Sequence, residues 1–239
     1  GSILNTDLGI DNYYMYDGYY NQSDGAWWGW RESVSIHSTN SKQGANEDLS
    51  FIKRKELSVN LKTSLWNRMI TADASFFVNS IEGKIVTSTT QYPEYFFTYY
   101  PTASFRPYIN YDNDRRMGFD FNVNYNKRFG KVDFTAGVTG TYYTTKATKR
   151  DELYQDKYQY RKGYAVDGIW GLQCIGFFKD EQDIIDSPEQ RLGGTIRPGD
   201  LKYVDQNNDG IIDDKDQVYL ARGGWYGAPL ALGINLTAK

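Results

Sequence analysis

Side chains that carry oxygen recur along residues 205–216 at the spacing of an EF-hand calcium loop. They occupy loop positions 1, 3, 5, 9 and 12, and the backbone carbonyl of position 7 adds a further oxygen. A hard cation of this kind needs six or more oxygens around one centre. The sequence therefore predicts bound Ca2+, with these ligands: Asp205, Asn207, Asp209, the Ile211 carbonyl, Asp213 and Asp216.

The loop must reverse sharply after its third ligand, and Gly210 supplies that turn because only glycine adopts such a conformation at little cost. Ile212, at position 8, is expected to point away from the ion and to anchor the loop. Position 12 is Asp216 rather than Glu, so its shorter side chain must lie closer to the ion. No long amphipathic helix flanks the loop, so a paired EF-hand is not expected, and a metal-free surface turn is the alternative.

Cation binding would have a mechanical effect here rather than a catalytic one. The carboxylates of a single loop repel each other, and a cation at their centre would allow the loop to close. The closed loop is expected to fix Tyr203 and Tyr219 on either side of it and to present a rigid surface to a partner or a substrate.

Composition and isolated reactive residues exclude several classes of protein. The net charge is −3, with Lys and Arg spread along the chain, so nothing favours nucleic acid. Cys174 is the sole cysteine and is expected to be a buried free thiol. His37 is the sole histidine and lacks the partners of a zinc site or a triad. With no nucleophile–base pair, metal-hydrolase signature or phosphate loop, an enzyme is not expected.

The rest of the chain has the period of β-strands. Apolar and polar residues alternate most clearly over 117–126, and the same alternation recurs over 28–37, 57–65, 70–78, 132–139 and 230–237. Aromatic residues make up 16% of a chain that is only 40% hydrophobic, which indicates strands whose two faces differ. A soluble sandwich and a membrane barrel both fit this pattern.

Connection lengths distinguish these architectures. Residues 66–68 and 127–130 form short turns, whereas about 79–116 and 144–229 form long loops. Short turns at one end and long loops at the other are typical of outer-membrane barrels, whose strands have about 9 to 11 residues. We therefore predict an all-β chain over 1–239, an antiparallel meander of transmembrane strands forming part of a barrel in a bacterial outer membrane. Long extracellular loops then connect the strands, and the second carries the calcium loop.

Aromatic residues near the N-terminus and in the first long loop are candidate substrate contacts, because rings stack on sugars and cover apolar groups. The candidates are Trp27, Trp28, Tyr99 and Tyr100. Packing of the loop on itself, or a place in the interfacial girdle of the membrane, explains the same residues equally well.

An ordered set of motifs resembles SusC/RagA-type TonB-dependent outer-membrane transporters. Residues 198–216, followed by Pro229 and a strand, are similar to the signature near the C-terminal end of that family. Residues 168–178 with 181–184 resemble the "G…G-I-F…E-I" stretch that precedes this signature.

Two further segments upstream fit the same family. Residues 46–51 resemble its "N-P-x-L-x-W" segment, although Glu47 and Phe51 replace the usual Pro and Trp, and residues 66–68 resemble its "n-N-R" turn. The resemblance implies a 22-stranded barrel that imports glycans or peptides with a SusD-like lipoprotein lid and energy from TonB. It also implies that this chain is a C-terminal piece of such a transporter, in contact with outer-membrane lipid.

Two other functions remain open at this point. A secreted carbohydrate-binding or adhesive β-domain with a calcium loop predicts a closed sandwich with its apolar strand faces turned inward. A dockerin-type module needs two such loops, each followed by a helix, whereas this sequence has one.

Overall fold

The computed structural model describes residues 1–6, 15–22, 26–28, 34–36, 39–92, 96–99, 102–223 and 228–239. The chain divides into two compact units. The first comprises Gly1–Glu152 together with Pro229–Lys239, and the second comprises Leu153–Ala228. The long strands lie in the first unit, and the predicted calcium loop lies in the second.

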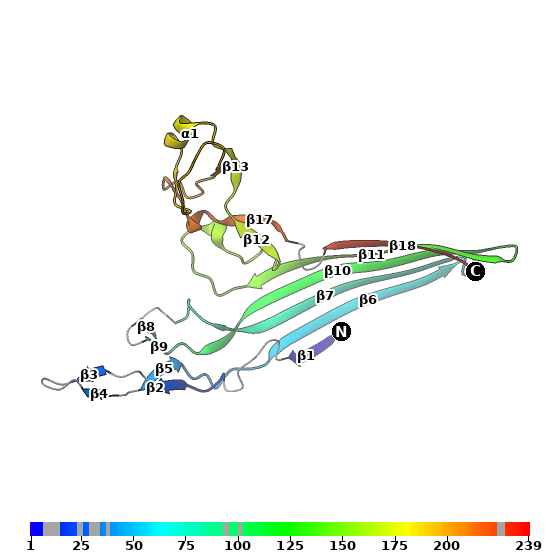
Figure 1. Ribbon diagram of the computed structural model, residues 1–239. Helices are drawn as coiled ribbons and strands as arrows, with labels where there is room; N and C mark the ends of the chain where they lie inside the picture. The colour runs from blue at the N-terminus through cyan, green and yellow to red at the C-terminus, as the bar shows by residue number, and fades with distance from the viewer. Residues whose placement is uncertain are drawn as a thin grey trace. The chain divides into compact units, whose positions relative to one another are not determined.

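The first unit is built on an antiparallel six-stranded sheet in the order β1-β6-β7-β10-β11-β18 (Figure 1). Its strands are β1 (Ser2–Thr6), β6 (Ile52–Leu65), β7 (Ile70–Thr87), β10 (Tyr108–Phe129), β11 (Val132–Lys149) and β18 (Leu230–Ala238). The sheet is open, with β1 and β18 at its two edges. The predicted all-β, antiparallel meander is confirmed.

One face of the sheet is apolar, because the residues that point to that side are apolar in successive strands. Cross-strand partners form transverse rows, including Val59–Phe76–Phe119–Tyr142–Leu230 and Leu61–Ala74–Phe121–Gly140–Leu232. Leu61 is 65% exposed and Ile234 is 80% exposed. The buried hydrophobic side chains of the described part of the chain are few, and they include Ile52, Ala147, Phe178 and Ile212.

The apolar rows extend along the strands for about the length of an outer-membrane strand. Residues 57–65 of β6 rise by about 3.3 Å each, so the rows cover roughly 25 Å along the strand. Strands of outer-membrane barrels cross the bilayer at a tilt and have about 9 to 11 residues, which is the length of this segment. The exposed face is therefore long enough to lie in a membrane.

The long strands confirm the predicted alternation but extend beyond its ends. β7 continues to Thr87, β10 begins at Tyr108 and β11 continues to Lys149. The connections predicted at 79–116 and 144–229 consequently shorten to 88–107 and 150–229. In the added strand residues, adjacent apolar or aromatic side chains (Ile85–Val86 and Tyr108–Ile109) and runs of polar ones interrupt the alternation, so no period of two marks these segments in the sequence.

Both predicted short turns are present. Trp66, Asn67 and Arg68 all have positive φ, of 49°, 51° and 66°, and the Met69 N–H donates to the Trp66 carbonyl at 3.0 Å. The second turn is shorter than predicted, because β10 runs on to Phe129 and the reversal falls at residues 130–131. Gly130 has a φ of 62°, which suits the first central position of a two-residue hairpin.

Short hairpins complete the first unit. β2 (Tyr19–Gln22) pairs with β5 (Thr39–Gln43), β3 (Ala26–Trp28) with β4 (Val34–Ile36), and β8 (Phe97–Tyr99) with β9 (Thr102–Ser104). The continuous strand predicted over 28–37 is wrong, since β3 and β4 are separate strands that pair with each other. His37 lies outside the described residues.

The second unit consists of short elements (Figure 1). β12 (Gly168–Gly171) pairs with β17 (Val218–Arg222), β13 (Cys174–Phe177) with β15 (Leu201–Tyr203), and β14 (Glu189–Gln190) with β16 (Ile211–Ile212). Helix α1 (Glu181–Ile185) and the 3-10 helices η2 (Lys157–Gln159) and η3 (Asp214–Asp216) lie between them. None of the helices among the described residues is long and apolar enough to cross a bilayer.

Cys174 is exposed, so the prediction of a buried thiol is wrong. Its strand β13 pairs with only one other short strand, and the register shifts between Cys174 and Gly176. A two-stranded ribbon of this kind offers no interior in which the thiol could be buried.

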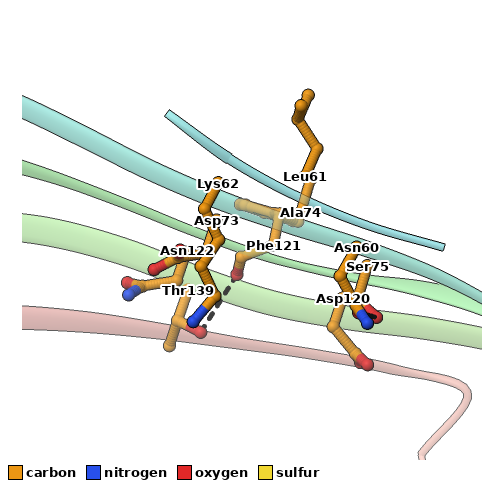
Figure 2. Close-up of a pocket in the computed structure, with 10 residues that line it drawn as sticks. All are labelled: Asn60, Leu61, Lys62, Asp73, Ala74, Ser75, Asp120, Phe121, Asn122 and Thr139. Atoms are coloured by element: carbon orange, nitrogen blue, oxygen red, sulfur yellow. Dashed lines mark hydrogen bonds between the residues drawn. The ribbon is translucent and has the colours of Figure 1, made fainter. Parts of the chain in front are cut away.

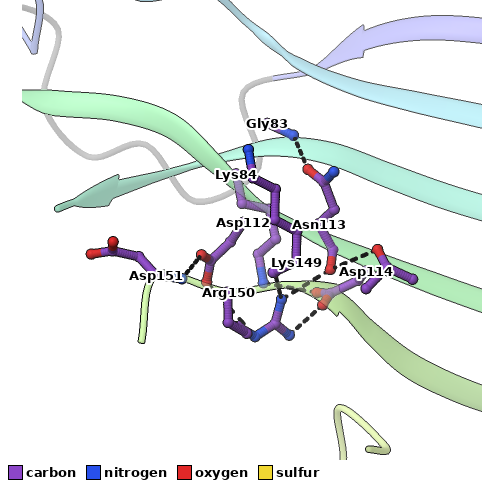
Figure 3. A network of polar contacts seen from close by, with 9 residues as sticks. Gly83, Lys84, Asp112, Asn113, Asp114, Lys149, Arg150 and Asp151 are labelled. Atoms are coloured by element: carbon purple, nitrogen blue, oxygen red, sulfur yellow. Dashed lines mark hydrogen bonds and ion pairs between the residues drawn. The ribbon is translucent and has the colours of Figure 1, made fainter. Parts of the chain in front are cut away.

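Charged side chains fix the bulged ends of β7 and β10 in the first unit (Figure 3). Arg150 pairs with Asp114 and lies 3.7 Å from Asp112, and Lys84 lies 3.0 Å from Asp114. The side chains of Arg150, Asp112 and Asp114 are less than 20% exposed. Partly buried charges are stable only when they are paired in this way. The network therefore stabilises the irregular register between these strands.

Asp151 extends this network to the start of the 88–107 connection. Its carboxylate accepts hydrogen bonds from the Thr89 N–H at 2.6 Å, from the Ser88 hydroxyl at 3.1 Å and from the Thr90 hydroxyl. Burial alone would raise the pKa of Asp151, but these hydrogen bonds outweigh it and hold the pKa below its ordinary value. The ionised form is therefore stabilised by folding.

Protonation of Asp151 is expected to loosen residues 88–90. Because its folded pKa is depressed, its contribution is fully present at neutral pH and is lost as the pH falls below about 4. Hydrogen exchange should show protection of the Thr89 and Thr90 amides falling over this range. Asp151→Asn should remove the pH dependence, whereas Glu47→Gln, at an exposed site, should retain it. Equal pH dependence in both variants would contradict the assignment.

Candidate functional site

The backbone of the predicted calcium loop forms the expected reversal. The Asp205 Oδ2 atom accepts a hydrogen bond from the Gly210 N–H at 2.8 Å. Gly210 has a φ of 82° and Asn208 a φ of 57°, so both lie in the left-handed region. The Asn207 and Asp209 side chains each accept from the N–H two residues ahead, at 2.9 Å. The first half of the loop is thus a series of side-chain-stabilised turns.

The second half of the loop is a capped 3-10 turn. The Asp213 side chain accepts from the Lys215 N–H at 2.8 Å, and the Asp213 N–H donates to Asp216 Oδ2 at 2.9 Å. The other Asp216 oxygen accepts from the Gln206 N–H at 2.8 Å. Asp216 is completely buried, so its carboxylate links the beginning of the loop to its end.

Ile212 anchors the loop as predicted. Its side chain is 1% exposed, and its strand β16 pairs in parallel with β14 through Gln190 and Ile212. A hydrophobic anchor at this position fixes the loop to the rest of its unit.

Part of this geometry suits a cation. Asp205 Oδ1 is completely buried and accepts no hydrogen bond, so one carboxylate oxygen is left for a ligand. Hydrogen bonds from the Ile211 N–H and the Asn207 amide lower the pKa of Asp209, which keeps it ionised. Within the described residues, however, no group of three or more His, Cys, Asp or Glu side chains is close enough to hold a metal. The turns and caps are in place, but the carboxylates do not converge on one centre.

A tyrosine distant in the sequence packs against the loop. The Tyr158 hydroxyl donates to the Lys215 carbonyl at 2.9 Å, and the Gln159 amide donates to the same oxygen at 3.1 Å. Burial, together with the charges of Asp156, Asp216 and Asp205, raises the pKa of Tyr158 to about 12. Tyr158 therefore remains protonated and holds the end of the loop. It lies outside the loop motif, so sequence spacing gave no signal for it.

Tyr219, expected beside the loop, belongs to an aromatic cluster. Its ring stacks on Tyr164 at 4.8 Å and meets Trp170 edge-on at 5.7 Å. Tyr203 lies in β15, where its N–H donates to the Gln190 side chain at 3.0 Å. These contacts hold the residues that flank the loop within the second unit.

The polar face of the large sheet carries a second candidate site, a shallow hollow of about 280 Å³. Polar side chains extend from neighbouring strands on one side of the backbone, while Leu61 extends from the other side (Figure 2). They are Asn60, Lys62, Asp73, Ser75, Asp120, Asn122 and Thr139. Such a surface can form hydrogen bonds with water or with a polar solute.

Carboxamides bridge three strands on the same face. The Asn235 Nδ2 atom donates to Asn124 Oδ1 at 3.2 Å, across β11. Gly137 lies between them, where a Cβ atom would come within 2.1 Å of Asn124 Oδ1 and 2.3 Å of Asn235 Oδ1. The absence of a side chain at Gly137 therefore permits the bridge.

Three of the four aromatic candidates for substrate contact lie in the short hairpins. Trp27 and Trp28 belong to β3 and Tyr99 belongs to β8. Tyr100 lies outside the described residues. Their role in substrate binding stays a prediction.

No protein-family model matches the sequence, and no curated protein does. Solved structures do show a similar fold. A structure of the RagAB peptide transporter is 14% identical, with a TM-score of 0.57, over 95% of this chain and 23% of that chain. The RagAB peptide importer in its "open-open" state is 12% identical, with a TM-score of 0.62, over 95% of this chain and 22% of that chain. The chain thus spans less than a quarter of their length, and the likeness is one of fold.

Proposed function

We propose that this chain is a membrane-embedded part of a SusC/RagA-like nutrient importer of the bacterial outer membrane. The importer would take up glycans or peptides, draw energy through TonB and work with a SusD-like lipoprotein. The chain itself would carry no catalytic activity. The fold likeness to RagAB peptide transporter chains supports this proposal.

The observation that carries the proposal is the sheet with one apolar and one polar face. Burying a large aliphatic or aromatic side chain is worth about 1.5–3 kcal/mol, and this sheet leaves many such side chains exposed. A lipid layer would remove them from water. The secreted sandwich, in contrast, predicts apolar faces turned into a closed interior, and the open sheet counts against it.

The polar face is suited to the water-filled side of such a strand array. It presents amides and hydroxyls across neighbouring strands, including Asn60, Asn122 and Thr139. Neutral hydrogen-bonding groups of this kind match the amides of peptides and the hydroxyls of glycans. We propose that the solute passes over this face.

Calcium is a second element of the proposal. It would bind residues 205–216 through Asp205, Asn207, Asp209, the Ile211 carbonyl, Asp213 and Asp216. The unpaired Asp205 Oδ1 atom and the preformed turn at Gly210 support this assignment. The ion would draw the carboxylates together and stiffen the loop, which would then offer a rigid surface to the lipoprotein or the solute.

Uptake measurements test the importer. Cells that make the intact protein should accumulate fluorescent oligopeptides or oligosaccharides, and deletion of its gene or of TonB should abolish accumulation. Affinity purification from the same cells should recover a lipoprotein, identified by mass spectrometry. Uptake that persists without the gene and without TonB would exclude the importer.

A further inference from the structure

Directly beyond the apolar rows, on the same face of the sheet, one transverse row carries positive charge. It consists of cross-strand partners on β6, β7, β10 and β11: Lys55, Ser80, Arg115 and Lys146. We call these residues the cationic row. It lies at the end of the sheet that leads to the long connections.

Two cations of this row, Arg115 and Lys146, face each other on neighbouring strands. Lys55 pairs with Glu82 at 2.5 Å. Arg115 and Lys146 are exposed and directly opposite each other, and within the described part of the chain their side chains make no ion pair or hydrogen bond. Like charges placed directly opposite on neighbouring strands are destabilising. A bound anion would relieve this repulsion.

The position of the cationic row indicates which anion fits. The next row on the same face is Leu57–Val78–Met117–Thr144, two residues along each strand. At about 3.3 Å per residue, this row starts roughly 7 Å from the cations. A phosphate held by the cations would thus lie at the edge of the apolar face. The first carbon atoms of an acyl chain attached to that phosphate would then contact the adjacent apolar side chains.

We propose that the cationic row binds the phosphate of an anionic membrane lipid. Arg115 offers a guanidinium fork that fits two phosphate oxygens, Lys146 offers a point charge, and the Ser80 hydroxyl can donate a further hydrogen bond. The acyl chains would then lie along Leu57, Val78 and Met117. This inference rests on the proposed function, because it requires the apolar face to lie in lipid.

Lipid titration tests the site. The intact protein in neutral detergent is titrated with phosphatidylglycerol labelled on an acyl chain, and with zwitterionic phosphatidylcholine for comparison. We expect preference for phosphatidylglycerol. The double variant Arg115→Gln/Lys146→Gln should bind it on the order of 10- to 30-fold more weakly, since each cation near an anionic lipid contributes about fivefold. The variant Lys179→Gln/Arg197→Gln removes the same two kinds of charge in the second unit and should bind as the parent does.

Thermal stability gives a second readout that a folding defect would not mimic. Without anionic lipid, the double variant should melt at the same temperature as the parent or higher, because the repulsion is gone. Phosphatidylglycerol should then raise the melting temperature of the parent and the control, but not of the double variant. Equal stabilisation of all three proteins would overturn the proposal.

Two further outcomes are decisive. Displacement of the labelled lipid by millimolar inorganic phosphate would mean a phosphate site, not a lipid site, and would overturn the inference. Flotation with pure phosphatidylcholine vesicles tests membrane embedding by itself. Flotation without any preference for phosphatidylglycerol would overturn the inference alone, whereas failure to float would remove the proposed function as well.

Discussion

Arginine in place of Leu61 is expected to destabilise the folded protein in a bilayer by about 2–4 kcal/mol. Leu61 lies in the middle of the apolar rows, between the rows of Leu57 and Leu65, and is 65% exposed. A charge at that level of the hydrocarbon layer loses its hydration and gains no partner. Urea unfolding of the intact protein in phosphatidylcholine vesicles, followed by tryptophan fluorescence, measures the change.

Asn60→Arg is the matched control, because it places the same charge one residue away on the polar face. It is expected to change the free energy of unfolding by no more than about 0.5 kcal/mol. A soluble protein would give a different result, since Leu61 would already face water and tolerate arginine. Equal stability of the two variants would therefore argue against a membrane location.

The sequence predicted the long strands because their two faces differ in polarity. The alternation of Met117, Phe119 and Phe121 with Gly118 and Asp120 recurs in the structure as two faces of β10. The strand ends were underestimated, because the bulged segment near Asp112 and Asp114 is polar on both faces and follows no period. Such ends are defined by ion pairs with residues distant in the sequence, as Arg150 shows.

At the candidate sites, too, local features could be predicted from the sequence, whereas contacts between distant residues could not. The loop motif predicted the turn at Gly210 and the anchor at Ile212, since both depend on local spacing. It gave no indication that Tyr158 would contact Lys215. The cationic row could not be predicted from the sequence either, because Arg115 and Lys146 become neighbours only through the register of β10 against β11. Contacts of this kind require the tertiary structure.

Loss of the Asp216 carboxylate is expected to destabilise the second unit by about 2–6 kcal/mol. Asp216→Ala would leave the partly buried N–H groups of Gln206 and Asp213 without acceptors, and each such group costs about 1–3 kcal/mol. Asp214→Ala removes a neighbouring carboxylate that, among the described residues, is bonded only to the Gln217 side chain, and it should have little effect. Thermal unfolding of the intact protein, with proteolysis of residues 153–228 as the local probe, measures both.

Calcium titration distinguishes this structural role of the loop from a role as a metal-binding site. If the ion binds, calcium at 100 times its dissociation constant should stabilise the loop by about 2.7 kcal/mol, and magnesium should do so less. Asp205→Asn keeps an acceptor for the Gly210 N–H but removes the charge at the unpaired oxygen. It should leave the metal-free stability nearly unchanged and weaken calcium binding by about tenfold or more, measured by calorimetry. If the parent protein does not respond to millimolar calcium, calcium binding is excluded. Asp216 then has a purely structural role, in which its carboxylate stabilises the loop through backbone hydrogen bonds alone.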